Sequence, residues 1–506
     1  MAKRVKFSEI SPSEFFYRNR DLAGFSNPSR SLYSAVREFV ENSLDACDEA
    51  GILPEIRVEL SYLEERRYDP QPYRLVVEDN GMGIDPKHLP DAFGRVFFGS
   101  KFVLKQARGM FGMGGTMAIL YSQITTNRPA KVSSSVDGVK RYSFELLIDI
   151  YENRPIIIER RVEPADRRGT RIEVSLYGDY SRAEPKITEY VRQTSLITPY
   201  ATLHFKDPKG RELHFERVTD VIPKPPSPTK PHPHGIDVEA LRRMIRLSKE
   251  RTLLKFMSSN FHRVGEKIAS AFLEFAGFDK DRDPRTLDNE ELVRFVEALR
   301  SYNGFLKPDS SCLSPVGEET LRAGIMKSLE PEFLEVVSRP PSAYSGYPFI
   351  IEAGLAYNCK GVNGLKLYRY ANRVPLLYDE YSDVVSKVVN DELDLRRYGI
   401  KPNTSLAIIT HICSTKVPYK TVGKEFVADR PEIERELKNA LRELLRRLRR
   451  YLGRKRSYEM VRRRMNIYGK YLPLLARFSK ELSGMKRMPR YRSLLKEGEL
   501  VEERHG

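Results

Sequence analysis

Residues 222–235, IPKPPSPTKPHPHG, constrain the fold of this chain more than any other segment. They contain six prolines. Proline has no backbone N–H and a fixed φ, so such a segment can lie neither inside a helix nor in a central strand. It therefore marks a boundary between folding units, and at 506 residues the chain has room for two to four domains with separate cores.

The sequences on the two sides of this boundary have different patterns. Before it, β-type runs alternate with helical patterns, which predicts an α/β sandwich rather than a helical bundle. After it, four amphipathic stretches with Asp and Asn caps predict a small all-helical unit. The clearest strands are expected at 73–79, 143–151, 171–178 and 201–207, and the helices at 237–248, 252–261, 264–277 and 289–302.

The last two hundred residues return to a mixed pattern. Strands are expected at 348–358 and 405–415. A helix is expected from 431 into the 460s, because leucines recur there at helical spacing (Leu437, Leu441, Leu444, Leu445, Leu448 and Leu452). The chain thus reads as an α+β protein with five parts: 1–222, a linker at 223–235, the helical unit 236–306, a second mixed unit 307–430, and a C-terminal helix and tail 431–506.

Composition places the chain among globular proteins. Its 40% hydrophobic and 31% charged residues are ordinary, and no apolar run approaches the roughly 18 residues of a membrane span. The N-terminus MAKRVKFSEI lacks the apolar stretch of a secretory signal, so we expect a cytoplasmic protein. The wide separation of Cys47, Cys312, Cys359 and Cys413 predicts buried free thiols rather than zinc ligands or disulfides.

Positive charge gathers near the C-terminus. The formal net charge is +17, and residues 431–506 hold 22 Lys/Arg against 10 Asp/Glu. Such a segment is typical of a surface that binds a polyanion or an acidic partner. A solvated helix without a partner is the alternative.

EFVENSLDA, at 38–46, places three polar residues on one side of a predicted helix. At about 100° per residue, Glu38, Asn42 and Asp45 fall within about 60° of arc, and apolar residues face the other way. Taken alone, this stripe is typical of a solvated face.

Two glycine-containing turns favour a site instead. VVEDNGMGI, at 76–84, ends a strand in Asp79 and two glycines, which permit a tight turn and close approach of the backbone to a ligand. RGMFGMGGTMAILYSQ, at 108–123, has glycines directly before an apolar helix, whose first N–H groups suit phosphate oxygens. Each has a plain alternative, a simple turn and a mobile loop, and neither is a Walker or Rossmann motif.

In this order the three segments together resemble the GHKL (Bergerat) ATP-binding fold of DNA gyrase B, Hsp90, histidine kinases and MutL. RGT at 168–170 resembles its fourth motif. Longer blocks between about residues 5 and 430 resemble the B subunits of archaeal DNA topoisomerase VI, among them SPSEFFYRNRDLAGFSNPSRSLYSAVREFVENSLDA, YPFIIEAGLAY and HICSTKVPYKTVGKE. This resemblance implies an ATPase domain at 1–222, a helix-two-turns-helix domain at 236–306 and a transducer domain at 307–430.

The resemblance also implies a role for individual residues. Glu38 would be the general base that activates water against the γ-phosphate of ATP, and Asn42 would supply an oxygen to Mg²⁺. Asp79 would accept a hydrogen bond from the adenine amino group, and Thr170 would reach the adenine through water. Lys424 would extend from the transducer domain to the γ-phosphate.

The phosphates would be held by two residues and a loop: Ser100, Lys101, Gly109, Met110, Phe111, Gly112, Met113, Gly114, Gly115 and Thr116. Thr116 stands where the family usually carries a lysine. Its hydroxyl can hydrogen-bond a phosphate or a magnesium-bound water, but it cannot neutralise charge.

The resemblance implies double-stranded DNA as a partner. Lys209 and Arg211 match a loop that the family uses against DNA, although Pro208 and Gly210 are equally typical of a plain hairpin tip. The sequence has no evident nucleophilic tyrosine in a helix-turn-helix, so DNA cleavage is expected from a topoisomerase VI A subunit in an A₂B₂ heterotetramer. The basic helix at 441–470 would contact DNA or that partner.

The sequence therefore predicts the ATP-hydrolysing B subunit of a type IIB topoisomerase. ATP would drive self-dimerisation and the passage of one duplex through a break in another. A MutL-type mismatch-repair ATPase shares the nucleotide site but is disfavoured by the helical insert. An Hsp90-like chaperone, which would need no DNA, and a scaffold without ATPase activity are further alternatives.

Overall fold

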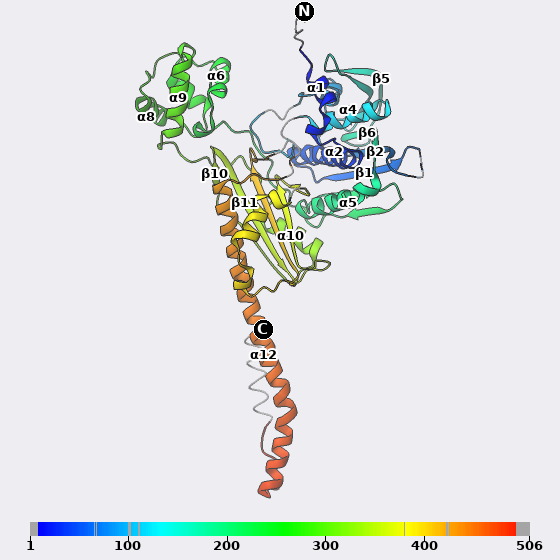
Figure 1. The fold of residues 1–506 in the computed structure, drawn as a ribbon, viewed down its shortest axis with the longest axis vertical. Coiled ribbons are helices and arrows are strands. Elements are labelled where there is room, and N and C mark those ends of the chain that lie inside the picture. The colour runs from blue at the N-terminus through cyan, green and yellow to red at the C-terminus, as the bar shows by residue number, and fades with distance from the viewer. Residues whose placement is uncertain are drawn as a thin grey trace, which may run out of the picture.

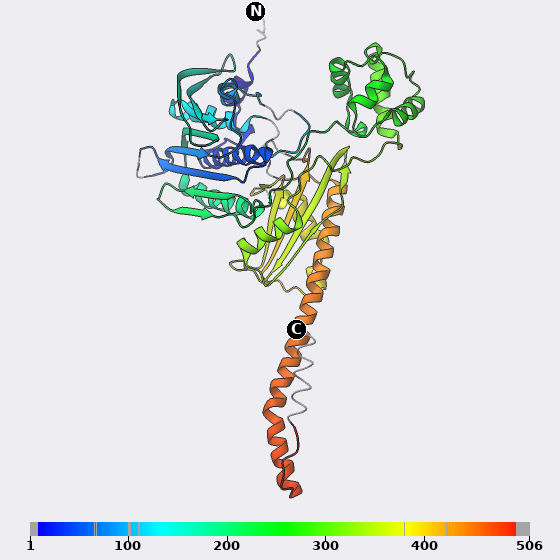
Figure 2. The ribbon, with the colours of Figure 1, turned by 180° about the vertical axis from the view of Figure 1, so that it is seen from behind.

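The computed structural model describes residues 9–491 except 65, 67, 100–102, 110, 111, 379, 421–423 and 425. Its elements gather around separate hydrophobic cores, and one long helix extends away from them (Figures 1 and 2). The predicted strands and the four predicted helices named above are all present, with ends within three residues of those expected.

The first unit is an eight-stranded sheet with helices packed against it. Its order is β5-β4-β3-β6-β2-β1-β7-β8, and neighbouring strands are antiparallel except for β1 and β7. The strands are β1 (Glu55–Tyr62), β2 (Gln71–Glu78), β3 (Ala130–Ser135), β4 (Lys140–Asp149), β5 (Arg154–Pro164), β6 (Gly169–Gly178), β7 (Thr202–Lys206) and β8 (Glu212–Phe215). The helices are α1 (Pro12–Arg18), α2 (Pro28–Ala50), α3 (Leu89–Gly94), α4 (Gly114–Thr126) and α5 (Tyr180–Ile197).

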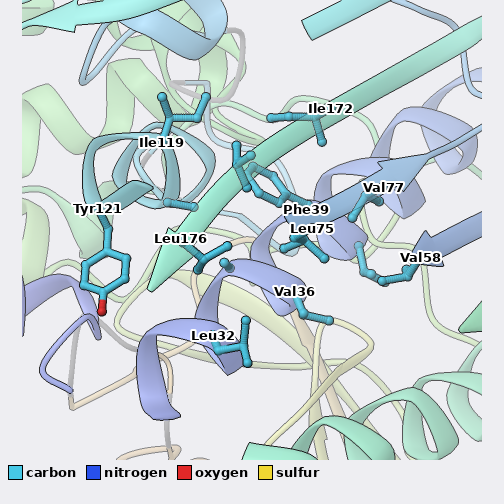
Figure 3. Packing of buried hydrophobic residues seen from close by; sticks show 14 of the residues in the cluster. Leu32, Val36, Phe39, Val58, Leu75, Val77, Ile119, Tyr121, Ile172 and Leu176 are labelled. Carbon is cyan, nitrogen blue, oxygen red and sulfur yellow. The ribbon is translucent and has the colours of Figure 1, made fainter. Parts of the chain in front are cut away.

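The apolar stripe of α2 decides how this helix is rotated. Leu32, Val36 and Phe39 recur at helical spacing and pack into the same core as the inward residues of β2 and β6 (Figure 3). Their burial turns a neighbouring stripe of α2, which includes Glu38 and Asn42, toward a cavity beside α4. The polar stripe is therefore not a solvated face.

The helical unit has a core of its own. Four helices, α6 (Val238–Leu247), α7 (Leu253–Asn260), α8 (Glu266–Ala276) and α9 (Asn289–Ser301), enclose Phe256, Phe272 and Phe295. Asp288 and Glu291 form a capping box that begins α9. In Figures 1 and 2 this unit stands apart from both sheets, joined by extended segments.

The second sheet is buried on both faces. Its order is β10-β11-β14-β12-β13, and β9 pairs with β11. On β14, Ile408 and Ile412 join the core under the long helix, whereas Ala407 and Ile409 join the core under α10. The elements are α10 (Glu318–Leu329), β9 (Phe333–Ser338), β10 (Ser342–Tyr344), β11 (Tyr347–Tyr357), β12 (Leu365–Ala371), β13 (Val374–Pro375), α11 (Val384–Lys387) and β14 (Leu406–Ser414). Burial on both faces explains why β11 and β14 read as continuous apolar runs.

The C-terminal helix α12 (Pro431–Ser483) is longer than predicted. It continues through Pro473, beyond the expected end in the 460s. The leucine stripe ends at Leu452, the last of the helix residues in the core of the second sheet. Most residues beyond Leu452 are exposed. Apolar residues do recur at helical spacing from Ile467 to Leu482, but Gly469 and Pro473, which usually weaken or end a helix, lie among them.

The four cysteines are buried free thiols. Within the described part of the chain, no helix combines the length and the hydropathy that crossing a bilayer would need.

Candidate functional site

A cavity of about 530 Å³ lies between α2, α3, the turn after β2 and the N-terminus of α4. It brings together the polar stripe of α2 and the glycine loop, as the sequence predicts. Its polar and loop lining includes Glu38, Asn42, Asp45, Gly109, Gly112, Met113, Gly114, Gly115, Thr116 and Lys424. Ser100, Lys101, Met110 and Phe111 lie outside the described residues.

The backbone of the glycine loop lies directly against the side chains of α2. A Cβ atom on Gly114 would stand 1.7 Å from Oε2 of Glu38, and one on Gly115 would stand 3.2 Å from Nδ2 of Asn42. Glycine is needed at 114 for this close approach rather than for a positive φ. Among the described residues, no side chain caps α4 at its N-terminus, so the N–H groups of its first turn suit an anionic ligand. Thr116 is buried in that turn.

Asp79, which is buried, is paired with the half-buried Thr170. Oδ1 of Asp79 accepts hydrogen bonds from the N–H groups of Gly81 (3.0 Å) and Thr170 (3.1 Å), and the N–H of Asp79 donates to the carbonyl of Thr170. Burial raises the pKa of Asp79 above its ordinary value, although these bonds and one from Ser43 oppose the shift. Neither Asp79 nor Thr170 is among the cavity-lining residues, but Met82 to Asp85, which follow Asp79, are.

Lys424 belongs to the second unit but reaches into the cavity of the first. Its Nζ donates to Oε2 of Glu41 over 2.9 Å and lies 3.7 Å from Oε1 of Glu38. Burial alone would lower the pKa of Lys424, but the carboxylates of Glu38 and Glu41 raise it above its ordinary value. The side chain is therefore a buried ammonium that joins the second unit to α2.

Sequence reasoning missed Glu41 and Arg37 at this position. Glu41 is 1% exposed, and burial raises its pKa. Arg37 donates to Oε1 of Glu38 over 2.7 Å and lies 3.4 Å from Glu41. Arg37 and Glu41 are four residues apart and so share a face of α2. This pairing of opposite charges at helical spacing is the signal that could have indicated them.

The β7–β8 turn is a hairpin tip. Oδ1 of Asp207 accepts the N–H groups of Lys209 and Arg211 and closes the turn. The Lys209 ammonium lies 2.6 Å from Glu184 of α5, and the Arg211 guanidinium lies 3.1 Å from the same carboxylate. Both cations remain about half exposed, at 55% and 43%, at the edge of the sheet formed by β8.

Comparison with known families matches both α/β units. Residues 27–176 match the histidine kinase-, DNA gyrase B- and HSP90-like ATPase family, and residues 308–464 match the topoisomerase VI B subunit transducer family. Among solved structures, the B-subunit of the DNA gyrase from Myxococcus xanthus aligns at 12% identity with a TM-score of 0.43, over 86% of this chain and 95% of that one, a likeness too low to support an inference.

Curated relatives match over nearly the whole chain. The B subunit of type 2 DNA topoisomerase 6 from Metallosphaera sedula is 45% identical over 94% of this chain and 90% of its own length. That of Saccharolobus solfataricus is 43% identical, over 99% and 95%. The transducer match and these relatives decide against the MutL-type and Hsp90-like alternatives, which share only the ATP-binding fold. The chain belongs to the family of B subunits of DNA topoisomerase VI, with an ATPase domain and a transducer domain.

Proposed function

We propose that this protein closes a dimer around DNA when ATP binds and reopens it when Glu38-assisted hydrolysis removes the γ-phosphate. Membership of the family establishes the activity, which is that of an ATP-dependent type IIB topoisomerase. The observation that carries the proposal is the position of Lys424, whose ammonium lies between Glu38 and Glu41 although it belongs to the transducer domain. A cation so placed is sensitive to what occupies the cavity.

In this proposal, ATP lies in the cavity in one orientation. The triphosphate lies at the N-terminus of α4, where N–H groups and the helix dipole favour negative charge. The adenine lies toward Asp79 and Thr170, where a carboxylate can accept from its amino group. Glu38 then stands beside the glycine loop, where it can orient a water molecule and take its proton.

The donor set beside the phosphate end fits Mg²⁺. Asn42 offers an amide oxygen, and Asp45 and Glu38 add carboxylate oxygens to the same cavity wall; magnesium prefers oxygen ligands and keeps several waters. Asn42 would hold the ion, with the phosphates completing its shell. The ion, when bound, supplies charge neutralisation on the transferred phosphoryl group.

Lys424 couples the cavity to the transducer. Phosphoryl transfer is catalysed mainly by positioning and by neutralising charge, so one cation at the γ-phosphate has large leverage. Drawing Lys424 toward a γ-phosphate moves the loop before α12, and the contact is lost after hydrolysis. ATP can drive this closure only as far as it binds the closed form more tightly than the open one.

The remaining machinery belongs to partners. We assign DNA cleavage to a topoisomerase VI A subunit in an A₂B₂ assembly, and DNA contact to Lys209, Arg211 and the basic part of α12. A protein that acts on chromosomal DNA belongs with the nucleoid in the cytoplasm. In this arrangement the present chain hydrolyses ATP, and the A subunit cleaves the DNA.

Relaxation of supercoiled plasmid by this chain and its A subunit, with and without ATP, tests the proposal. We expect relaxation to require both ATP and the A subunit. With Glu38→Ala, ATP should still bind while turnover falls by about a hundredfold or more, the loss expected of a general base. Hydrolysis by Glu38→Ala at the rate of the unaltered chain would show that another group activates the water.

A further inference from the structure

The stem of the glycine loop, residues 104–108, is fastened to the transducer and the proline-rich linker. The side-chain amide of Gln106 donates to the carbonyl of Ser314 over 3.0 Å, and the N–H of Ser314 donates back over 2.7 Å. Nδ2 of Asn372 donates to the carbonyl of Ala107 over 3.1 Å. The N–H of Thr229, in the linker, donates to the carbonyl of Leu104. These bonds join segments that lie far apart in the sequence.

A buried ion-pair cluster completes this attachment. Arg108 of the stem donates to Asp45 (3.0 Å) and to Asp48 (2.6 Å), both on α2. Asp48 also accepts from the guanidinium of Arg373 over 2.9 Å and from the hydroxyl of Tyr200 over 3.1 Å. Two guanidinium groups thus share one carboxylate at a site where all the charged side chains are buried. Because Asp45 lines the nucleotide cavity, the cluster runs from that cavity to the transducer.

Arg373 is held rigidly on the transducer side. It lies in the tight turn between β12 and β13, where both Asn372 (φ 47°) and Arg373 (φ 65°) adopt the left-handed conformation. Its N–H donates to Nε2 of His411 over 3.0 Å, and Nδ1 of His411 lies 2.8 Å from Glu352. A bulky residue keeps such a backbone conformation only where its surroundings enforce it. Nη2 of Arg373 donates to the carbonyl of Ser314 over 2.8 Å, so the transducer holds both the backbone and the guanidinium of this residue.

We propose that Arg373 is a positioning residue for nucleotide binding: by pairing with Asp48 beside Arg108, it sets the glycine-loop stem relative to α2. The inference rests on the proposed function, because it gives that cavity a second connection to the transducer. This connection does not pass through Lys424. Both ends of the cavity then respond to the transducer, the catalytic end through Lys424 and the loop end through Arg373.

The chain offers a matched control in Arg369. Arg369 lies on β12, is as buried as Arg373, and pairs with Asp383 at 3.5 Å and with the carbonyl of Leu376 at 2.9 Å, all inside the transducer. Replacing either arginine leaves a buried carboxylate with one cation fewer, which destabilises a fold in either case. Of the two arginines, Arg373 is the one whose carboxylate partner belongs to the ATPase domain.

The test compares Arg373→Gln, Arg373→Lys and Arg369→Gln in the full-length chain by hydrogen–deuterium exchange of residues 103–109 and by calorimetric titration with ATP. We expect Arg373→Gln to speed exchange of the stem and to weaken ATP binding about tenfold, within the usual range of coupling between sites. Arg369→Gln should change neither, and Arg373→Lys should restore part of both because it keeps the charge. If Arg373→Gln does not fold, Arg373→Lys carries the comparison.

Equal effects of the Arg373 and Arg369 variants would overturn the proposal, because both arginines would then be only structural. So would a folded Arg373→Gln protein with the stem exchange and ATP affinity of the unaltered chain. Lys424→Met should leave hydrogen–deuterium exchange of the stem unchanged. Faster exchange of the stem in this variant would show that the Lys424 and Arg373 contacts form a single connection to the transducer. Hydrogen–deuterium exchange of the stem is measured without nucleotide, so it reports whether Arg373 holds the stem even if the chain does not bind ATP. Failure of the unaltered chain to bind ATP would instead reject the proposed function.

Discussion

At the scale of single residues, the nucleotide cavity depends on buried charges that compensate one another. Lys424 and Arg37 face Glu38 and Glu41, so each of these charges is buried beside an opposite one. Buried ions keep their charge only under such compensation. The balance holds the groups in place before any chemistry, which is what a catalyst of phosphoryl transfer requires.

Gly114→Ala tests how closely the loop approaches α2. The added methyl group would overlap the carboxylate of Glu38, so either the loop or Glu38 must move. We expect ATP turnover to fall by about a hundredfold, the cost of misplacing a catalytic group by about 1 Å. The control is Gly453→Ala on α12, where a Cβ meets nothing within 4 Å. It should leave turnover unchanged and stabilise the helix by up to about 1 kcal/mol. Unchanged turnover in Gly114→Ala would mean that the loop adapts freely.

Asp79→Asn separates stability from binding. Burial raises the pKa of Asp79, so its ionised form is disfavoured in the fold, and the stability linked to its proton is lost as pH rises through the folded-state pKa. Asparagine keeps the acceptor for Gly81 and Thr170 without the charge. At neutral pH we expect an unchanged or higher Tm, whereas ATP affinity falls about thirtyfold for the loss of a charge-assisted bond of about 2 kcal/mol. Calorimetry of ATP binding at about pH 7 checks this, and undiminished affinity would remove Asp79 from the adenine site.

At the scale of elements, the buried apolar face of a helix or strand sets the direction of the functional side chains on its other faces. The apolar stripe of α2 fixes the direction of Glu38, and the two-faced burial of β14 fixes the transducer against α12. The β7–β8 hairpin differs, because its two cations are half exposed, although Glu184 pairs with both and Asp207 with Arg211. It is the element best placed to bind phosphates without sequence preference.

A hairpin variant, Lys209→Ala with Arg211→Ala, tests this element. Each phosphate contact releases counterions, so we expect weaker plasmid binding and a slope of log K against log [salt] smaller by about one to two. ATP turnover without DNA should not change, because the hairpin lies outside the cavity. The double variant Lys360→Ala with Glu330→Ala, an exposed ion pair elsewhere, is the control. An unaltered salt slope in the hairpin variant would exclude a DNA contact there.

At the scale of the whole molecule, the two α/β units communicate across long sequence separations. Lys424 and Glu41 are 383 residues apart in the chain, and Arg373 and Asp48 are 325 apart. The core around α10 includes Leu196 and Ile197 of α5, so apolar packing also joins the units. A displacement at the cavity can therefore reach the second sheet and α12, which extends far from both (Figure 1).

Lys424→Met tests transmission at this scale. Without the ammonium, we expect ATP to bind with affinity within about tenfold of the unaltered chain, since the phosphates keep their other donors. Hydrolysis and plasmid relaxation with the A subunit should both be lost. Single-turnover hydrolysis and a relaxation assay measure the two effects. Plasmid relaxation by Lys424→Met at the rate of the unaltered chain would show that Lys424 is not needed to couple dimer closure to the opening of the DNA break.

The sequence alone determined many of the elements and part of the cavity wall, but not the side of the cavity formed by His88, Ala92 and Phe93. The spacing of apolar residues predicts α2 and the stripe that carries Glu38 and Asn42, and the glycines before α4 predict a loop that approaches a phosphate. Such local periodicity decides which face of an element is buried, so side chains on the other faces can be placed before any tertiary contact is known. The site of Lys424 was predicted only through family resemblance.

The tertiary structure decided which distant charges meet. The roles of Glu41 and of the Asp48–Arg108–Arg373 cluster follow from packing between the two sheets, and local patterns do not encode pairings across hundreds of residues. The last part of α12, from the 460s to Ser483, also escaped prediction, because Gly469 and Pro473 are typical of a helix end. Burial of one face of an element gives a periodic apolar pattern in the sequence, whereas the partner of a buried charge depends on the packing of the whole fold.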